Sequence, residues 1–249
     1  MSGHSKWSTI KRQKGINDAK RGASFTKMGM AIAIAAREGG GGDPASNFKL
    51  RLAMDQARAV NMPKENVQRA IDRGLGKGGA SAIETVVYEG YGPAKVALIV
   101  TATTDNKNRT TPEVRSTIEK GGGTFATPGT VDWAFENMGL ITIDKGLKSI
   151  DEIFELAADA GAEDLEDAVD VVEVYTKPSD VEKVKNALIE NGLTVEGFEI
   201  IKKPTTLVEI KDAETAKKVL ALIEKIEDLD DVQKVYANFD IPDNLLSDA

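Results

Sequence analysis

Apolar residues in the first 75 positions recur every three or four residues, the spacing that places them on one face of a helix. The pattern predicts a helix over Asp18–Arg37 and a second over Asn47–Val60. A third begins at Pro63, because a missing N–H costs no hydrogen bond at the first position of a helix. Glycines at 39–42 and Gly74 end the first and third helices. This part of the chain is therefore predicted to be a small three-helix domain behind a polar N-terminal arm.

Beyond a glycine-rich linker at residues 74–80, short apolar runs separated by turn residues are typical of alternating strands and helices. Thr111 suits an N-cap and Pro112 the first position of the next helix, which the glycines at 121–123 end. Acidic runs such as Glu163-Asp164 and the aspartates at 228–231 are interpreted as solvated turns and helix ends. The remaining elements are strands at 84–91, 95–103, 131–135, 140–143, 169–175, 193–201, 206–210 and 232–237, and helices at 150–160, 179–191 and 213–227.

This order of elements favours α+β layers over a long parallel sheet. The units at 84–122 and 206–240 are each too small for a good core, so we expect them to pair in space. The predicted domains are a basic helical domain at 1–80, an α+β domain made of 81–129 and 204–249, and an inserted α+β domain at 130–203. A chain of 249 residues is long enough for such a division.

Charge is distributed unevenly along the chain. Residues 1–80 carry 15 Lys and Arg against 6 Asp and Glu, a net charge of +9, and the remaining residues carry a net charge of −17. Such asymmetry favours binding of a polyanion through the basic end. Seven cations in the first 27 residues face a single acid, and cations at this density bind phosphates without sequence preference.

The residues offer little for catalysis. The chain has one histidine, His4, and no cysteine, which excludes a cysteine nucleophile and a Cys/His zinc site. The glycine-rich stretches follow helices, and neither has the strand-to-helix context of a phosphate loop. We therefore expect no enzymatic activity, no catalytic residue, no metal, no cofactor and no small-molecule substrate.

Candidate nucleic-acid contacts come from two segments. Trp7 lies among the cations of the arm, where its ring could stack on an unpaired base or pack locally. A polar loop at 105–109 precedes a helix, whose N-terminus attracts phosphate; its asparagines could equally stabilise a turn. The predicted contact residues are Lys6, Trp7, Lys11, Arg12, Lys14, Lys20, Arg21, Lys27, Arg51, Asn106, Lys107 and Arg109.

Several motifs carry a resemblance to the YebC/PmpR family. They are Gly-His-Ser-Lys-Trp at 3–7, Asp-Ala-Lys-Arg-Gly at 18–22, Asn-Met-Pro at 61–63, Tyr-Glu-Gly-Tyr-Gly-Pro at 88–93, Thr-Asp-Asn-Lys-Asn-Arg-Thr at 104–110 and Asp-Asp-Val-Gln-Lys-Val-Tyr at 230–236. The resemblance spans the chain and implies an N-terminal helical domain with two α+β (ferredoxin-like) domains, one inserted in the other. Met30-Ala31 stands where the family pattern has an Arg-Glu pair.

The resemblance implies one of two functions. Some members are described as DNA-binding transcriptional regulators, and others, including a mitochondrial relative, as ribosome-associated translation factors that ease synthesis through proline-rich stretches. The sequence favours the translation factor, because no pattern marks a recognition helix and a cationic arm with one Trp suits single-stranded RNA. An acidic scaffold with an incidental basic arm is a third alternative. The expected partner is ribosomal RNA or DNA, and the expected protein is a cytoplasmic monomer without a membrane segment.

Overall fold

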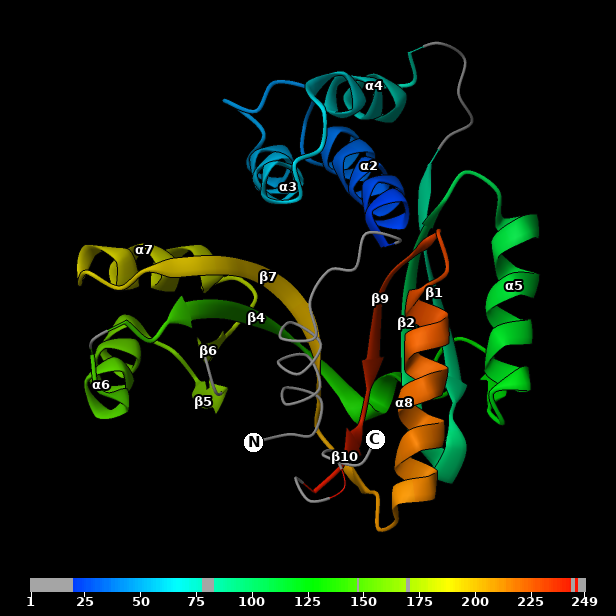
Figure 1. Cartoon of the computed structure of the whole chain (residues 1–249). Helices are drawn as coiled ribbons and strands as arrows, with labels where there is room; N and C mark the ends of the chain where they lie inside the picture. The colour runs from blue at the N-terminus through cyan, green and yellow to red at the C-terminus, as the bar shows by residue number, and fades with distance from the viewer. Residues whose placement is uncertain (1–19, 78–82, 147, 169–170, 243–244, 246–249) are drawn as a thin grey trace. The chain divides into compact units, whose positions relative to one another are not determined.

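The computed structural model describes residues 20–77, 83–146, 148–168, 171–242 and 245 (Figure 1). For residues 20–24, 48 and 59 it describes the backbone alone. The chain divides into two compact units. Within the described residues, one unit holds 20–131 and 212–235, and the other holds 132–211 and 236–245. The N-terminal helical segment followed by antiparallel sheets confirms the predicted α+β class. The three-domain bounds stay a prediction.

The first unit opens with three helices, α2 (Lys20–Glu38), α3 (Phe48–Ala59) and α4 (Lys64–Gly74), which together are called the helical segment (Figure 1). Apolar side chains at helical spacing pack α2 against both of the others. The fully buried members of this core include Ile32, Ala36, Leu50 and Ala57. The predicted helices are therefore present, with ends shifted by one or two residues.

Asn47 holds the turn between α2 and α3 together. Its buried side chain accepts from the Leu50 N–H at 2.9 Å and so caps α3. The same amide donates to the carbonyl of Ala35 at 2.8 Å and to that of Gly41 at 2.7 Å. One side chain thus satisfies a carbonyl in the last turn of α2, a carbonyl in the turn that follows, and an N–H at the start of α3.

Met30 belongs to a second apolar cluster of this unit. It is 5% exposed and packs with Ala33 and Ile83, with the half-buried Ile34 beside them. An arginine or glutamate in this position would need a partner to offset its desolvation. The apolar pair at 30–31 therefore suits the packing of α2 in this chain.

The remainder of the first unit is a four-stranded sheet in the order β3-β1-β2-β9, with helices α5 (Lys107–Lys120) and α8 (Ala213–Glu227) side by side (Figure 1). β1 (Glu84–Tyr91) and β2 (Ala97–Thr104) form the predicted hairpin. β3 (Thr124–Ala126) is a short strand beside β1 that the sequence did not predict. β9 (Val232–Ala237) and α8 have the predicted bounds. A short 3₁₀ turn, η1 (Pro93–Lys95), joins the hairpin.

Helix α5 corrects one prediction. It begins at Lys107 rather than at Pro112, because Asn106 caps it: the Asn106 side chain accepts from the Arg109 N–H at 3.3 Å. Pro112 then lies inside the helix, where it has no N–H to donate to the carbonyl of Asn108. Asn is among the strongest N-cap residues, whereas Thr is weaker, so the earlier start prevails.

The second unit is a four-stranded antiparallel sheet in the order β5-β6-β4-β7 with α6 (Ile150–Ala160) and α7 (Val181–Glu190) packed on its apolar face. β4 (Phe135–Asp144) is one strand where the sequence predicted two, at 131–135 and 140–143, and a 3₁₀ turn, η2 (Asp132–Ala134), precedes it. β6 (Val171–Thr176) and β7 (Val195–Pro204) lie close to the predicted ranges.

β5 (Asp164–Ala168) corrects a second prediction, since its acidic residues suggested a solvated turn. They form a strand paired with β6. Lys203 of β7 explains why: its ammonium lies 2.7 Å from Asp164, 3.5 Å from Glu166, and 3.5 Å from the centre of the Tyr175 ring. One cation therefore offsets the charge that would otherwise disfavour this strand.

Two more short strands, β8 (Val208–Glu209) and β10 (Phe239–Asp240), pair in parallel. β8 is shorter than the strand predicted at 206–210. In the part of the chain that the structure describes, no helix combines the length and the apolar character needed to span a membrane.

Candidate nucleic-acid interface

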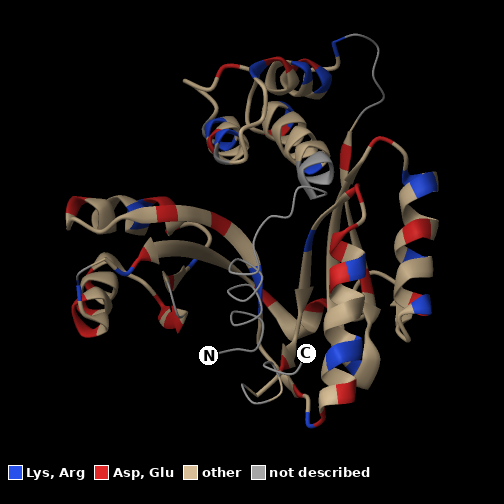
Figure 2. Cartoon of the chain, viewed as in Figure 1, with Lys and Arg blue, Asp and Glu red and all other residues tan. Residues whose placement is uncertain are grey.

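The helical segment carries exposed cations on α3 and α4, which Figure 2 shows in blue. Most of them are fixed by neighbouring groups. Arg58 forms an ion pair with Asp55 at 2.8 Å, and Arg69 donates to the Asn66 side chain. These contacts are local and solvent-exposed, so each stabilises the fold by at most about 1 kcal/mol. The same cations therefore stay accessible to an anionic partner.

Five of the predicted contact residues, all in the arm, lie outside the described residues: Lys6, Trp7, Lys11, Arg12 and Lys14. Lys20 and Arg21 lie in the first turn of α2, and their side chains are not described. Contact of these seven residues with nucleic acid stays a prediction.

Two predicted residues of the helical segment have defined surroundings. The half-buried Lys27 donates to the main-chain carbonyl of Glu227, the last residue of α8. Arg51 is exposed on α3 and donates to the carbonyl of Pro44 at 3.0 Å. Arg51 thus lies on the surface, with Arg58 about two turns further along the same helix, whereas Lys27 is engaged with the protein.

The predicted loop at 105–109 is the start of α5, and its side chains are tied into the first unit. Asn106 caps the helix, and its own N–H donates to the Thr104 hydroxyl at 2.9 Å. Lys107 forms an ion pair with Glu84 of β1 at 2.7 Å. These contacts give Asn106 the turn-stabilising role that the sequence left open as an alternative. Lys107 remains half exposed beside the helix N-terminus.

Arg109 and Asp231 form the centre of a polar cluster between α5 and the start of β9. The Arg109 guanidinium lies 2.7 and 3.0 Å from the two carboxylate oxygens of Asp231. Hydrogen bonding to Asp231 raises the pKa of Arg109 above its ordinary value, so the guanidinium stays charged. The Asp231 side chain is 5% exposed, and the Arg109 side chain is 51% exposed.

Two threonine hydroxyls complete the shell around Asp231. Thr110 donates to the Asp231 carboxylate at 2.6 Å and Thr104 at 3.2 Å, and both threonines are buried. The main-chain carbonyl of Asp231 accepts from the Thr103 N–H at 2.7 Å. A buried carboxylate is stable when donors surround it in this way. The cluster therefore fixes the start of α5 against β2 and β9.

The cluster extends to the helical segment through Asp105. This carboxylate accepts from Arg109 at 3.3 Å and pairs with Arg73 of α4. The positive charge of Arg73 is therefore partly neutralised. The charges at the start of α5 are thus two arginines, Arg73 and Arg109, and two carboxylates, Asp105 and Asp231. The electrostatic potential there depends on how these four groups pair.

Sequence reasoning missed Asp231, Thr104 and Thr110 as structural partners of Arg109. Asp231 was interpreted as part of a solvated acidic run, yet it is buried. The available signal was indirect: 104–110 and 230–236 are both among the motifs that carry the family resemblance. The structure brings those two motifs together across more than a hundred residues.

The described ranges hold no candidate metal site. Within them, no three His, Asp or Glu side chains are placed to hold one metal ion. The chain's one histidine, His4, lies outside the described residues.

Comparison with known proteins gives a consistent result over the whole chain. A family profile described as the TACO1/YebC protein N-terminal domain matches residues 5–77. A second, described as the TACO1/YebC second and third domain, matches residues 83–239. The first match covers the helical segment, and the second covers both four-stranded sheets.

Individual relatives agree with these profiles. A "probable transcriptional regulatory protein" of Roseiflexus castenholzii is 54% identical, with 98% of this chain and 97% of that protein covered. A protein of the same name from Chloroflexus aurantiacus is 51% identical over 99% and 98%. The crystal structure of a conserved hypothetical protein from Aquifex aeolicus superposes with a TM-score of 0.83 at 44% identity, covering 91% of this chain and 93% of that one.

Proposed function

The chain belongs to the TACO1/YebC family of gene-expression regulators, and we propose that it acts by binding nucleic acid through its basic N-terminal residues. The observation that carries the proposal is the net charge of +9 in residues 1–80 against −17 in the remainder. A phosphate backbone is attracted to the first part and repelled by the second. The charge distribution thus gives the protein one nucleic-acid-binding end.

RNA is the target that the residues favour, within a ribosome-associated translation factor that eases synthesis of difficult, proline-rich sequences. The cations of the helical segment are divided between two short helices, α3 of 12 residues and α4 of 11, rather than gathered on one exposed helix of the kind that fills a major groove. The arm combines cations with Trp7, a pairing that suits unpaired bases. We infer no catalytic role, and we place the protein in the cytoplasm as a monomer.

The start of α5 is a second proposed contact. Lys107 and Asn108 are exposed there, and the first N–H groups of a helix lack carbonyl partners within the helix. Arg109 contributes through its half-exposed guanidinium while Asp231 fixes its position. Asn106 supports the site indirectly by capping the helix.

A DNA-binding transcriptional regulator is the second candidate. It is supported by the names of relatives such as those from Roseiflexus and Chloroflexus, which are called probable transcriptional regulatory proteins. The two candidates differ in the nucleic acid that the protein should prefer. A transcriptional regulator must bind duplex DNA of a particular sequence more tightly than single-stranded RNA, whereas a translation factor need not.

Ribosome co-sedimentation and duplex-DNA titration of the same full-length protein separate the two candidates. The translation proposal predicts that the protein sediments with ribosomes and that its affinity for single-stranded RNA exceeds its affinity for duplex DNA at equal salt. Binding to a defined duplex without ribosome association would favour the transcriptional candidate. Absence of binding to ribosomes, RNA and DNA would reject the proposal as a whole.

A further inference from the structure

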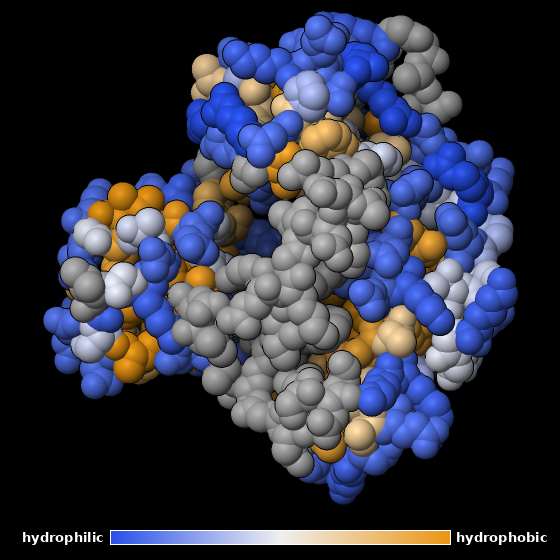
Figure 3. Space-filling model, in the orientation of Figure 1, coloured by the Kyte–Doolittle hydropathy of each residue, from blue (hydrophilic) through white to orange (hydrophobic). Residues whose placement is uncertain are grey.

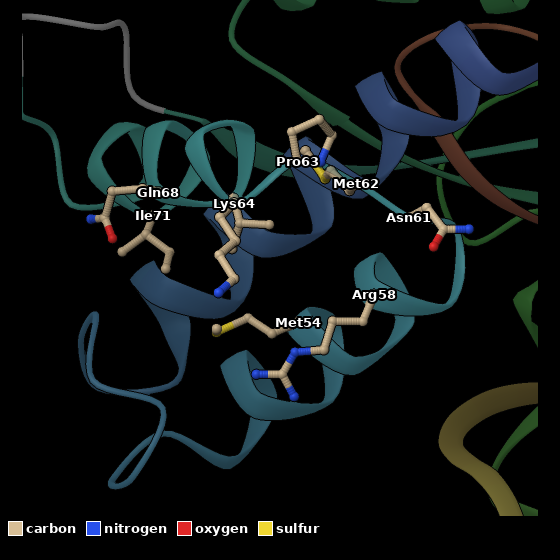
Figure 4. A pocket seen from close by; sticks show the side chains of 9 residues that line it. Met54, Arg58, Asn61, Met62, Pro63, Lys64, Gln68 and Ile71 are labelled. Carbon is tan, nitrogen blue, oxygen red and sulfur yellow. The ribbon is translucent and has the colours of Figure 1, made fainter.

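A groove opens between α3 and α4 of the helical segment. Its volume of about 570 Å³ lies within the roughly 300–1,000 Å³ of sites that hold small molecules. Met54 of α3 and Val67 and Ile71 of α4 line it together with Met62 from the connecting turn. Figure 4 shows Met54 of α3 and Lys64 of α4 pointing toward one another across the space between the two helices, with Arg58 lying along α3. The apolar lining can therefore be reached from solvent.

The rim of this groove is polar and cationic. Arg58, Asn61, Lys64 and Gln68 line it beside the apolar residues. Figure 3 shows the same mixture over the visible face of the helical segment, with hydrophilic residues around smaller apolar areas. A flat apolar molecule with polar edges and a negative charge matches such a lining.

A second hollow of about 340 Å³ continues the groove along α3. It shares Met54 and Arg58 with the first and adds Arg51. Among the described residues that line the two hollows, Asp55 is the one acid, and Arg58 pairs with it at 2.8 Å. Arg51, Arg58 and Lys64 therefore mark a cationic track that passes the apolar floor.

The backbone at Asn61 has an uncommon conformation. Asn61 adopts φ 57°, in the left-handed region that asparagine tolerates better than most residues. The turn is closed by hydrogen bonds from the Asn61 N–H to the Arg58 carbonyl and from the Met62 N–H to the Ala57 carbonyl, both 2.9 Å. The turn thus places the Asn61 amide on the rim of the groove and the thioether of the next residue, Met62, in its floor.

We propose that this groove takes one unstacked nucleotide of a single-stranded nucleic acid. The apolar floor covers a face of the base, the rim amides bond its edge, and the cations hold the neighbouring phosphates. An apolar helix of a protein partner is the competing occupant; the cationic track favours the polyanion. The inference rests on the proposed function and adds a base-binding site to it.

Matched substitutions test the groove in the full-length protein. Asn61→Asp keeps a side chain that tolerates the left-handed backbone and adds one negative charge at the rim. Gln56→Glu adds the same charge on the exposed side of α3, about 200° around the helix from Met54. We expect Asn61→Asp to weaken oligouridine binding about tenfold, as for loss of one base contact, and Gln56→Glu to change it less than about twofold.

Photo-crosslinking gives an independent measurement. The probe is single-stranded oligouridine with one 4-thiouridine, and the crosslinked protein is digested with trypsin. The proposal predicts adducts in the peptides 52–58 and 59–64, which hold Met54, Asn61 and Met62. An excess of the same oligomer without bases, as ribose phosphate, should leave most of these adducts in place, because it lacks the group that the floor binds.

The outcomes separate this site from the proposed function. If the wild type binds oligouridine but Asn61→Asp and Gln56→Glu weaken binding equally, and no adduct maps to residues 52–64, the groove is not a base site and the function stands. If the wild type binds no nucleic acid, both fail. If Asn61→Asp unfolds, judged by circular dichroism, Lys64→Ala against Lys49→Ala provides the same comparison with exposed lysines.

Discussion

The Asp231 cluster makes a quantitative prediction about how the first unit is held together. Asp231→Asn keeps the side-chain volume and one carbonyl oxygen but removes the charge that Arg109, Thr110 and Thr104 surround. The substitution therefore tests whether the buried carboxylate stabilises the start of α5 or merely occupies space there.

The expected cost follows from the exposure of each partner. The pair with Arg109 contributes at most about 1 kcal/mol, because that side chain is half exposed and solvent screens it. Hydrogen bonds to a charged group contribute about 1.5–3 kcal/mol each, and the two buried threonines retain weakened bonds to an asparagine oxygen. We expect Asp231→Asn to lower the local free energy of unfolding by about 2 kcal/mol.

Hydrogen exchange measured by mass spectrometry reports this energy for the peptides that contain β2, α5 and β9. The matched control is Asp230→Asn, which removes the same charge from an exposed neighbour. We expect Asp231→Asn to speed exchange in those peptides and Asp230→Asn to leave their exchange rates unchanged. Equal effects of the two substitutions, or a loss below about 0.5 kcal/mol, would refute the reasoning.

Three further predictions concern local structure. Asn106→Ala should destabilise α5 by about 1 kcal/mol through loss of its cap, seen as faster exchange in its first turn. Gly74→Ala should destabilise the helical segment by about 1–3 kcal/mol in thermal unfolding, because the added Cβ meets the backbone of Ala33. Hydrogen bonds from the Ser149 main-chain N–H and hydroxyl lower the pKa of Glu152, so this contribution to α6 is present above the ordinary value of 4.5 and is lost as pH falls through the lowered pKa. Ser149→Ala should reduce that pH dependence in the exchange of α6 without abolishing it, because it removes the hydroxyl bond and keeps the main-chain bond.

Sequence patterns located most elements of the fold because the core positions are periodic. Helix α8 and strand β9 have the predicted bounds, and the Asp212 side chain caps α8 at the start that was predicted. The start of α5 was wrong because Thr111-Pro112 resembles a helix start, while Asn106 is the cap that the chain uses. β5 was missed because its charge is offset by Lys203, which lies on another strand.

The candidate site was less accessible to prediction. Counting charges along the sequence located the basic N-terminal residues, because such a count needs no knowledge of the fold. The partner of Arg109 could not be predicted, because Asp231 lies 122 positions away and an isolated aspartate carries no mark of burial. The α3–α4 groove was likewise not predictable from the sequence, because Met54 occupies an apolar position of one helix and Met62 lies in the turn before the next, with nothing in the pattern to indicate a hollow between them.

The most direct test of nucleic-acid binding through the N-terminal residues is the salt dependence of single-stranded RNA binding by two full-length variants. One replaces Lys11, Arg12 and Lys14 by Gln, and the other replaces the exposed Lys148, Lys183 and Lys217 by Gln. Each removes three positive charges. We expect the first variant to lower the log–log salt slope by about 2, near 0.7 per lost phosphate contact, and the second to leave it unchanged. Equal slopes for both variants and the wild type would contradict binding through the N-terminal residues.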